Sequence, residues 1–112
     1  MARRLAVLAV LAGAALPAWT QETASELFRR PDKGHCIACH QVPGVAALAT
    51  RSDLGPALTG ERMRALGKPK LREVIVDPTQ ANPATVMPPF GRHNILDAGE
   101  IQRLVDFLHA LP

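Results

Sequence analysis

The run Cys36-Ile37-Ala38-Cys39-His40 contains both cysteines of this 112-residue chain. The C-x-x-C-H spacing is typical of c-type haem attachment, in which two thiols meet the two vinyl groups of one porphyrin and the adjacent imidazole becomes an axial iron ligand. A thioredoxin-like pair or half of a zinc site would also use C-x-x-C, but no second cysteine pair and no βαβ pattern is present. A disulfide or chance spacing is the remaining alternative. The motif therefore predicts one covalently bound haem c on Cys36 and Cys39, with His40 as a ligand of the iron.

The first 20 residues have the pattern of a secretory signal peptide. Arg3 and Arg4 form a charged start, and an apolar run follows from Leu5 to Leu16. This run is about a dozen residues long, whereas a membrane-crossing helix needs about 20, so an uncleaved anchor is the weaker interpretation. We expect cleavage between residues 18 and 24, no membrane span in the mature form, and a periplasmic location. Export would also bring the two thiols to the compartment outside the cytosol in which haem c is attached.

Removal of the signal peptide changes the charge balance. The whole chain has 13 Lys+Arg and 10 Asp+Glu, a net charge of +3; without Arg3 and Arg4 the basic count is 11 and the net charge is +1. The basicity of the chain therefore belongs mostly to the signal. A nucleic-acid partner is not expected.

The mature chain, residues 21–112, is expected to form one small domain. About 90 residues give only a marginal core of side chains, and we see no repeat or linker that marks a second domain. A buried porphyrin supplies apolar area that so short a chain lacks. The chain without haem is therefore predicted to fold poorly.

Helices are predicted at both ends of this domain. A short helix runs from Thr23 or Ser25 to about Arg30, and Pro31 ends it. The last helix starts at Asp97, whose capping box with the glutamate three residues later is followed by an apolar face. This face consists of Ile101, Leu104, Val105 and Leu108. We expect it to pack against Leu27 and Phe28, which closes the chain around the haem.

The middle of the chain alternates loops with one further helix. Residues 51–60 contain glycine and proline and are predicted to form a loop. Residues 70–77 have apolar side chains at helical spacing and are predicted to form a helix that ends before Pro78. A proline-rich loop is predicted to follow, up to Gly91.

Met87 is the leading candidate for the second axial ligand. It lies in Pro83-Ala84-Thr85-Val86-Met87-Pro88-Pro89-Phe90, where prolines stiffen a loop that can hold a thioether over a haem face. The alternative is that Met87 only fills a gap in the core. Met63 lies in the charged run Glu61-Arg62-Met63-Arg64, so we expect it to be half-exposed and not a ligand.

The other histidines are predicted to be structural or exposed. His93 follows the Met87 loop and is a weaker competitor for the iron, while His35 cannot fold back onto the iron that His40 occupies. His109 falls in the last helical turn, where a cation is favoured. The ring of His40 should donate its second nitrogen to a backbone carbonyl, and that of Pro56 is the candidate.

Taken together, these features resemble a class I cytochrome c over the whole mature chain. They are the C-x-x-C-H motif, the loop Gly55-Pro56-Ala57-Leu58-Thr59-Gly60, the loop of Met87 and the C-terminal helix. The resemblance implies an all-α protein with the small class I cytochrome c fold, in which the terminal helices pack around one covalent haem.

Several short segments resemble more narrowly the SoxX subunit of the sulfur-oxidising multienzyme system. In order, they are Leu71-Arg72-Glu73-Val74-Ile75-Val76-Asp77-Pro78, Met87-Pro88-Pro89-Phe90-Gly91-Arg92, Ile95-Leu96 and Glu100-Ile101. SoxX pairs with SoxA, a cytochrome that oxidatively attaches thiosulfate to a cysteine of a carrier protein. The resemblance implies an electron-accepting subunit of a SoxAX-type L-cysteine S-thiosulfotransferase, not catalytic alone. Its partners would be a SoxA-like cytochrome subunit, in a heterodimer, and a downstream electron-acceptor cytochrome.

Two alternatives to this function stay open. A freestanding periplasmic electron shuttle would share the fold but lack an enzymatic partner, and a haem sensor would need an open iron position. An obligate partner requires an apolar patch near the haem edge. Candidates for that patch are Val42, Val45, Ala46, Ala47, Leu48 and Phe90, although we expect most of them to belong to the core.

Overall fold

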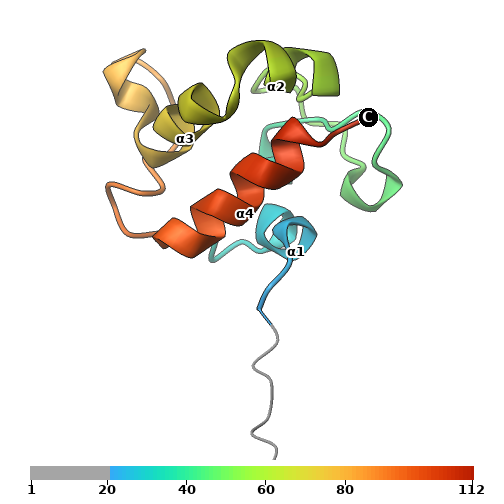
Figure 1. Cartoon of the computed structure of the whole chain (residues 1–112), viewed down its shortest axis with the longest axis horizontal. Coiled ribbons are helices and arrows are strands. Elements are labelled where there is room, and N and C mark those ends of the chain that lie inside the picture. Colours follow the sequence, from blue (N-terminus) through green and yellow to red (C-terminus); the bar gives the residue numbers. More distant parts are fainter. Residues whose placement is uncertain (1–20) are drawn as a thin grey trace, which may run out of the picture.

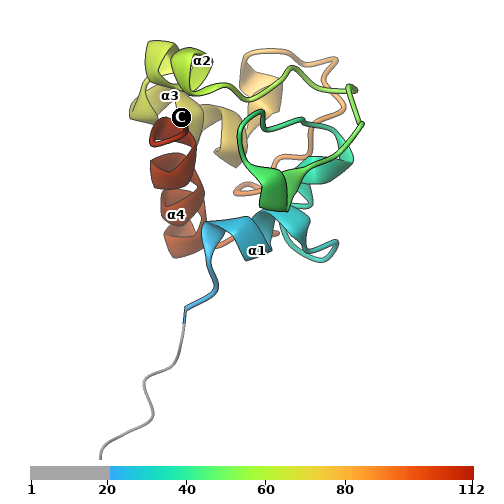
Figure 2. The same ribbon diagram turned by 90° about the vertical axis from the view of Figure 1, so that its right-hand side faces the viewer.

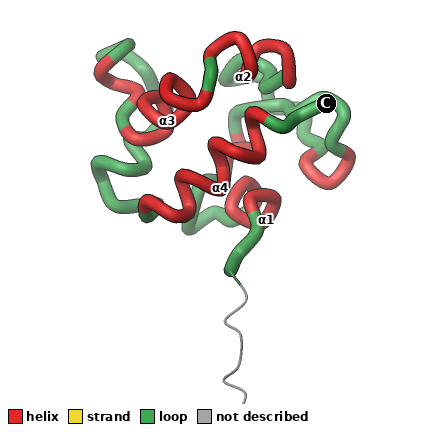
Figure 3. Tube along the Cα trace, viewed as in Figure 1, coloured by secondary structure: helices red, strands yellow, loops and turns green. Residues whose placement is uncertain are grey.

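The computed structural model describes residues 21–112, and within this range it contains helices, turns and loops but no strand. Its four α-helices are α1 (Ala24–Arg29), α2 (Gly60–Leu66), α3 (Lys68–Val76) and α4 (Ala98–His109), and its short 3-10 turns are η1 (Cys36–Ala38), η2 (Ala46–Leu48) and η3 (Pro78–Gln80) (Figures 1 and 3). The predicted all-α class is confirmed. The predicted signal peptide lies outside the described residues. Among the helices of residues 21–112, none has the length and apolar character needed to cross a membrane.

Helix α4 is the central element of the fold and is formed as the sequence predicts. Asp97 is its N-cap: the Asp97 side chain accepts from the Glu100 backbone N–H at 2.8 Å, and Glu100 returns a bond to the Asp97 N–H at 2.9 Å. The predicted apolar face is buried, with exposed fractions of its four side chains between 1% and 5%. In Figure 1, α4 crosses the middle of the molecule, with α1 on one side and α2 and α3 on the other.

Helix α1 packs against α4, as predicted. It has only six residues, which is too short to be stable alone, but Thr23 and Glu26 form a capping box at its start. Leu27 and Phe28 are fully buried. Phe28 meets Phe107 of α4 edge to face, with ring centroids 5.4 Å apart. The contact between terminal helices is therefore confirmed, with Phe107 as an additional member.

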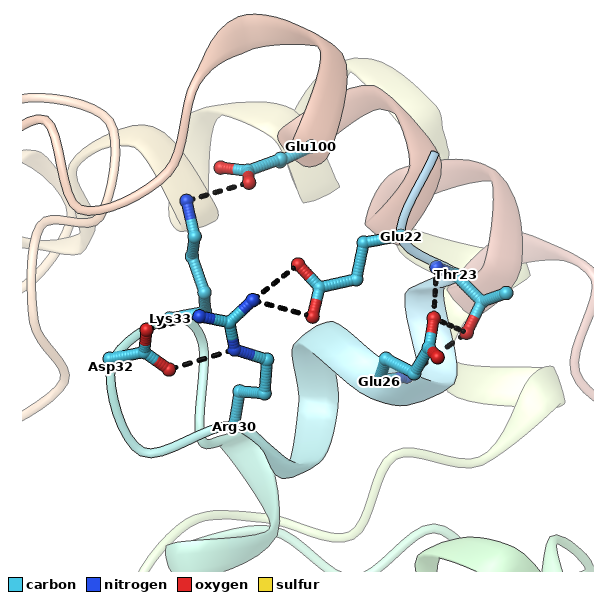
Figure 4. Close-up of polar contacts among 7 residues, drawn as sticks. All are labelled: Glu22, Thr23, Glu26, Arg30, Asp32, Lys33 and Glu100. Carbon is cyan, nitrogen blue, oxygen red and sulfur yellow. Dashed lines mark hydrogen bonds and ion pairs between the residues drawn. The ribbon is translucent and has the colours of Figure 1, made fainter. Parts of the chain in front are cut away.

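Two sets of ion pairs lie next to the C-x-x-C-H motif (Figure 4). Arg30, just after α1, bonds the carboxylates of Glu22, before α1, and of Asp32, after it. Lys33, in the turn before the motif, places its Nζ 2.7 Å from Oε1 of the buried Glu100. Glu100 thus caps α4 with one oxygen and binds the turn that leads to Cys36 with the other.

Helix α2 was not predicted. Three of its seven residues are charged, and its capping residue Thr59 lacks a glutamate or glutamine three positions later, so the local signal is weak. Gly67, with φ of 79°, separates it from α3. Helix α3 begins at Lys68, slightly before the predicted start, and ends at Val76 before Pro78 as expected. Both helices contact α4.

Long connecting segments occupy the other side of the molecule. Figure 2 shows α2, α3 and α4 gathered on one side, with the segments 31–59 and 77–97 opposite them. From the apolar set considered for a partner surface, Val42, Leu48 and Phe90 are buried in the core. Val45 is partly buried against this core, whereas Ala46 and Ala47 are exposed. This set is therefore mostly core, as predicted.

Candidate functional site

A large apolar cavity lies between the helices and the connecting segments. Its volume is about 530 Å³, within the usual range for small-molecule and cofactor sites. Every α-helix contributes to its wall, as do the C-x-x-C-H motif, residues 54–58 and residues 85–90. Buried wall residues include Phe28, Leu71, Ile75, Phe90, Leu104 and Leu108.

The C-x-x-C-H motif forms a tight turn at one edge of this cavity. His35 starts the turn in the left-handed region, with φ of 47°, and the backbone N–H groups of Cys39 and His40 donate to the Cys36 carbonyl at 3.1 and 2.8 Å. Gly34 allows the preceding turn to pack closely, because a Cβ there would lie 2.9 Å from the Leu27 carbonyl oxygen. Cys36, Cys39 and His40 all line the cavity.

Neither alternative chemistry for the cysteines is supported. Both thiols are free, so they do not form a disulfide. Within residues 21–112, no group of three His, Cys, Asp or Glu side chains is placed to hold a metal ion, as a zinc site would require. Burial raises the pKa of Cys36 to about 12, which keeps its thiol protonated at neutral pH, unlike a thioredoxin-type nucleophile.

The imidazole of His40 is held in one tautomer. Its Nδ1 lies 2.7 Å from the carbonyl oxygen of Pro56, and because a carbonyl only accepts, Nδ1 carries the proton. The Pro56 carbonyl was the predicted partner, and the contact is confirmed. Nε2 is then unprotonated, and an unprotonated imidazole nitrogen is the one that can ligate iron.

Gly55 is a site residue whose role the sequence did not indicate. Its N–H donates to the Cys39 carbonyl at 2.8 Å, which ties the 51–58 loop to the motif. A Cβ on Gly55 would lie 2.4 to 2.8 Å from three atoms of the His40 ring. Only glycine lets the loop pass this close to the imidazole and present the next carbonyl to Nδ1.

Met87 lies on the same cavity as His40. It is partly buried against the core, and its N–H donates to the Thr85 hydroxyl at 3.1 Å. The surrounding residues form no helix or strand, as predicted for a proline-rich loop. The structure thus brings the candidate sulfur ligand and the candidate nitrogen ligand, from distant parts of the sequence, to one apolar space.

The expectation that Met63 is half-exposed was wrong. Met63 is only 2% exposed and lines the cavity from α2, while its charged neighbours Glu61, Arg62 and Arg64 are exposed. Helix formation separates the faces of these adjacent residues and turns Met63 inward.

The other histidines agree with expectation. His93 is exposed and does not line the cavity, and His109 ends α4. His35 is exposed at the edge of the cavity.

The mouth of the cavity carries exposed apolar side chains. Within residues 21–112, the exposed large hydrophobic residues are Leu54, Leu66 and Val86, and all three line the cavity. Val86 is 86% exposed and Leu54 is 75% exposed. These residues are not evident from the sequence, because an isolated apolar side chain in a loop, such as Leu54 or Val86, or at the end of a short helix, such as Leu66, carries little signal.

These features define a c-type cytochrome. The chain belongs to the family of cytochrome c oxidase, cbb3-type, subunit III, whose sequence profile matches residues 20–108. The family implies haem c as the cofactor. The residues fit this group: the cavity is apolar and of suitable size, and its wall presents a free imidazole nitrogen, a thioether and two free thiols.

Known proteins that are similar to this chain include the following two. An "Uncharacterized lipoprotein" of Aquifex aeolicus (strain VF5) is 32% identical over 77 residues, which are 69% of this chain but only 36% of that protein. A chain of the crystal structure of SoxXA from P. pantotrophus has a TM-score of 0.66 at 22% identity, covering 78% of this chain and 77% of that one. This likeness shows that the two chains share the class I cytochrome c fold.

Proposed function

We propose that this protein is a monohaem electron-transfer cytochrome in which Cys36 and Cys39 hold the porphyrin by thioether bonds. His40, through Nε2, and Met87, through its sulfur, are the axial ligands of the iron. The observation that carries the proposal is the convergence of these four side chains on one apolar cavity. The bond from His40 Nδ1 to the Pro56 carbonyl supports the assignment, because it leaves Nε2 free for the metal.

The ligand set favours electron transfer over catalysis or ligand sensing. When bound, haem supplies a one-electron Fe(III)/Fe(II) couple. Met87 fills the position that a sensor would keep open, and both cysteines are used in thioethers, so neither is left as a nucleophile. A thioether ligand also favours the ferrous state over a second imidazole, which predicts a positive reduction potential.

The proposed physiological role is that of a SoxX-like subunit in the periplasm. In this role the protein accepts electrons from a SoxA-like cytochrome while thiosulfate is conjugated to a carrier-protein cysteine, and passes them to a downstream cytochrome. Support comes from the fold shared with a SoxXA chain and from the exposed Leu54, Leu66 and Val86 around the cavity mouth. Exposed apolar side chains at one place are expected where a stable partner docks.

The axial ligand assignment is tested by Met87→Ala. This variant should retain covalent haem and lose the low-spin visible spectrum in the ferric state. An unchanged spectrum would show that Met87 is not a ligand. The double variant Cys36→Ala and Cys39→Ala should not retain haem under denaturing conditions, and a well-folded haem-free double variant would contradict the whole assignment.

The physiological role is tested by purification from the native periplasm under mild conditions. We expect a second cytochrome to co-purify, and thiosulfate to reduce the haem of this protein only when that cytochrome and the carrier protein are present. A monomer that thiosulfate does not reduce in their presence would instead identify a freestanding electron shuttle.

A further inference from the structure

The loop that carries Met87 is closed at its base. Residues 77 and 92 flank this loop, and the N–H groups of Gly91 and Arg92 both donate to the Val76 carbonyl, at 3.1 and 3.0 Å. A Cβ on Gly91 would lie 2.9 Å from the Cα of Val76, so the two ends of the loop are in close contact at its base. The chain leaves α3 and returns to the same point after presenting Met87 to the cavity.

A buried carboxylate holds this base together. Asp77 is 8% exposed, and its Oδ1 accepts from the N–H and the hydroxyl of Thr79, the former at 3.1 Å. Its Oδ2 accepts from Gln80 Nε2 at 3.2 Å and from Arg92 Nη1 at 3.0 Å. The Thr79 hydrogen bond lowers the pKa of Asp77 to about 2, so the carboxylate is ionised at neutral pH. Asp77 therefore connects the first residues of the loop to its last residue through charge-assisted bonds.

The tip of the loop has no comparable attachment. Within the part of the chain that the structure describes, each hydrogen bond of residues 81–89 has its partner inside the segment 78–93, such as Ala84 N–H to Asn82 Oδ1 and Met87 N–H to Thr85 Oγ1. The tip is thus internally ordered and meets the rest of the described protein by packing alone. Its hydrogen-bonded connection to the rest of the described protein therefore runs through the base.

We propose that Asp77 and Arg92 form a clamp that positions Met87. The closed clamp keeps the thioether at the second axial position of the haem, and a loosened clamp opens that position to outside ligands. This inference rests on the proposed ligation by Met87. Asp77 and Arg92 are positioning residues, because they act on the iron only through the loop.

Binding of imidazole to the ferric holoprotein measures this effect. Imidazole binds only after Met87 leaves the iron, so its apparent affinity and its binding rate scale with the fraction of open loop. Asp77→Asn keeps the shape of the side chain but removes its charge, and leaves an amide facing Gln80 and Arg92. We expect imidazole affinity and binding rate to rise by about tenfold, as for loss of a hydrogen bond to a charged group.

Glu100→Gln is the matched control. Glu100 is also buried, at 6% exposure, but its side-chain hydrogen bond and ion pair go to Asp97 and Lys33 and not to the loop of Met87. This variant should weaken the fold while imidazole binding stays within roughly twofold of wild type. Equal effects of Asp77→Asn and Glu100→Gln on imidazole binding would overturn the clamp, because general destabilisation would then explain both.

Two further variants separate the clamp from the ligand assignment. Arg92→Gln changes a side chain that is 55% exposed, so it is less disruptive to folding, and it should raise imidazole affinity as Asp77→Asn does. The double variant of Asp77→Asn and Arg92→Gln should raise the affinity by less than the product of the two single effects. A wild-type result for Arg92→Gln would refute the clamp. In Met87→Ala, imidazole should bind most tightly and Asp77→Asn should add nothing. Wild-type affinity in Met87→Ala would instead refute ligation by Met87.

Discussion

Replacement of Gly55 by alanine should damage the site through the imidazole of His40. The new Cβ would lie 2.4 Å from His40 Cε1, 2.7 Å from Nδ1 and 2.8 Å from Nε2, whereas ordinary contact begins at 3.4 Å. The ring or the loop must therefore move by about 1.0 Å, the difference between 3.4 and 2.4 Å. Neither is free to move, because the ring bonds Pro56 and the loop bonds Cys39.

The structure gives the size of the effect. A displacement of this size lengthens the contact from His40 Nδ1 to the Pro56 carbonyl from 2.7 Å to as much as about 3.7 Å, beyond hydrogen-bond range. Loss of such an outer partner typically weakens a metal–ligand bond by about 10- to 100-fold. Protons compete with iron for the imidazole nitrogen. A tenfold weaker bond to the iron therefore raises the midpoint pH of acid displacement of the ligand by about one unit.

An acid titration of the ferric holoprotein tests this reasoning. The low-spin spectrum of Gly55→Ala should disappear at a pH about one to two units higher than in wild type. Gly99→Ala is the matched control. Gly99 lies in the first turn of α4, and a Cβ there would come no closer than 3.3 Å to any atom outside the backbone of its own helix. An unchanged midpoint in Gly55→Ala would mean that the close approach of the loop does not hold the ring.

Three further predictions concern stability. Leu27→Ala removes a fully buried side chain of α1 and should lower the free energy of unfolding of the holoprotein by about 2–5 kcal/mol, measured by guanidinium titration; a loss below about 1 kcal/mol would contradict the packing. Asp97→Ala removes the N-cap of α4 and should cost about 0.5–2 kcal/mol in the same assay, a cost that Asp97→Asn should largely avoid. Because the pKa of Asp77 is lowered from 3.8 to about 2, mainly by Thr79, its ionised form stabilises the fold above about pH 4 and this contribution is lost as the pH falls toward 2. Unfolding of Asp77→Asn between pH 2 and 5 should therefore depend less on pH than that of wild type, and equal slopes would disprove this role.

The terminal helices were predictable because their signals are local. Asp97 and Glu100 are three residues apart, and the apolar positions of α4 recur at helical spacing. The partner of this face was also predictable, because few apolar residues remained near the start of the domain. The C-x-x-C-H motif indicated the chemistry of the site from five consecutive residues.

Other features that depend on tertiary contacts were not predictable. In α2, the direction of Met63 follows from packing of the whole helix, while its neighbours in sequence suggested the surface. Asp77 appeared only as the end of a helix, since its partner Arg92 is separated from it by the whole Met87 loop. The demand for glycine at position 55 arises from a ring that belongs to another segment.

The arrangement of the core explains why cofactor and fold should depend on each other. Two of the largest fully buried side chains, Phe28 and Leu104, also line the cavity, so part of the apolar interior surrounds a space instead of filling it. Without the cofactor, an apolar space of this size would remove packing contacts from the side chains of its wall. Helices as short as α1 and α2 cannot offset such a loss by themselves. Haem would complete the core from within, and its bonds to Cys36, Cys39, His40 and Met87 would join the two long connecting segments that carry the site. The chain without haem should consequently lose fixed tertiary packing, with weak near-UV circular dichroism even where helical signal persists.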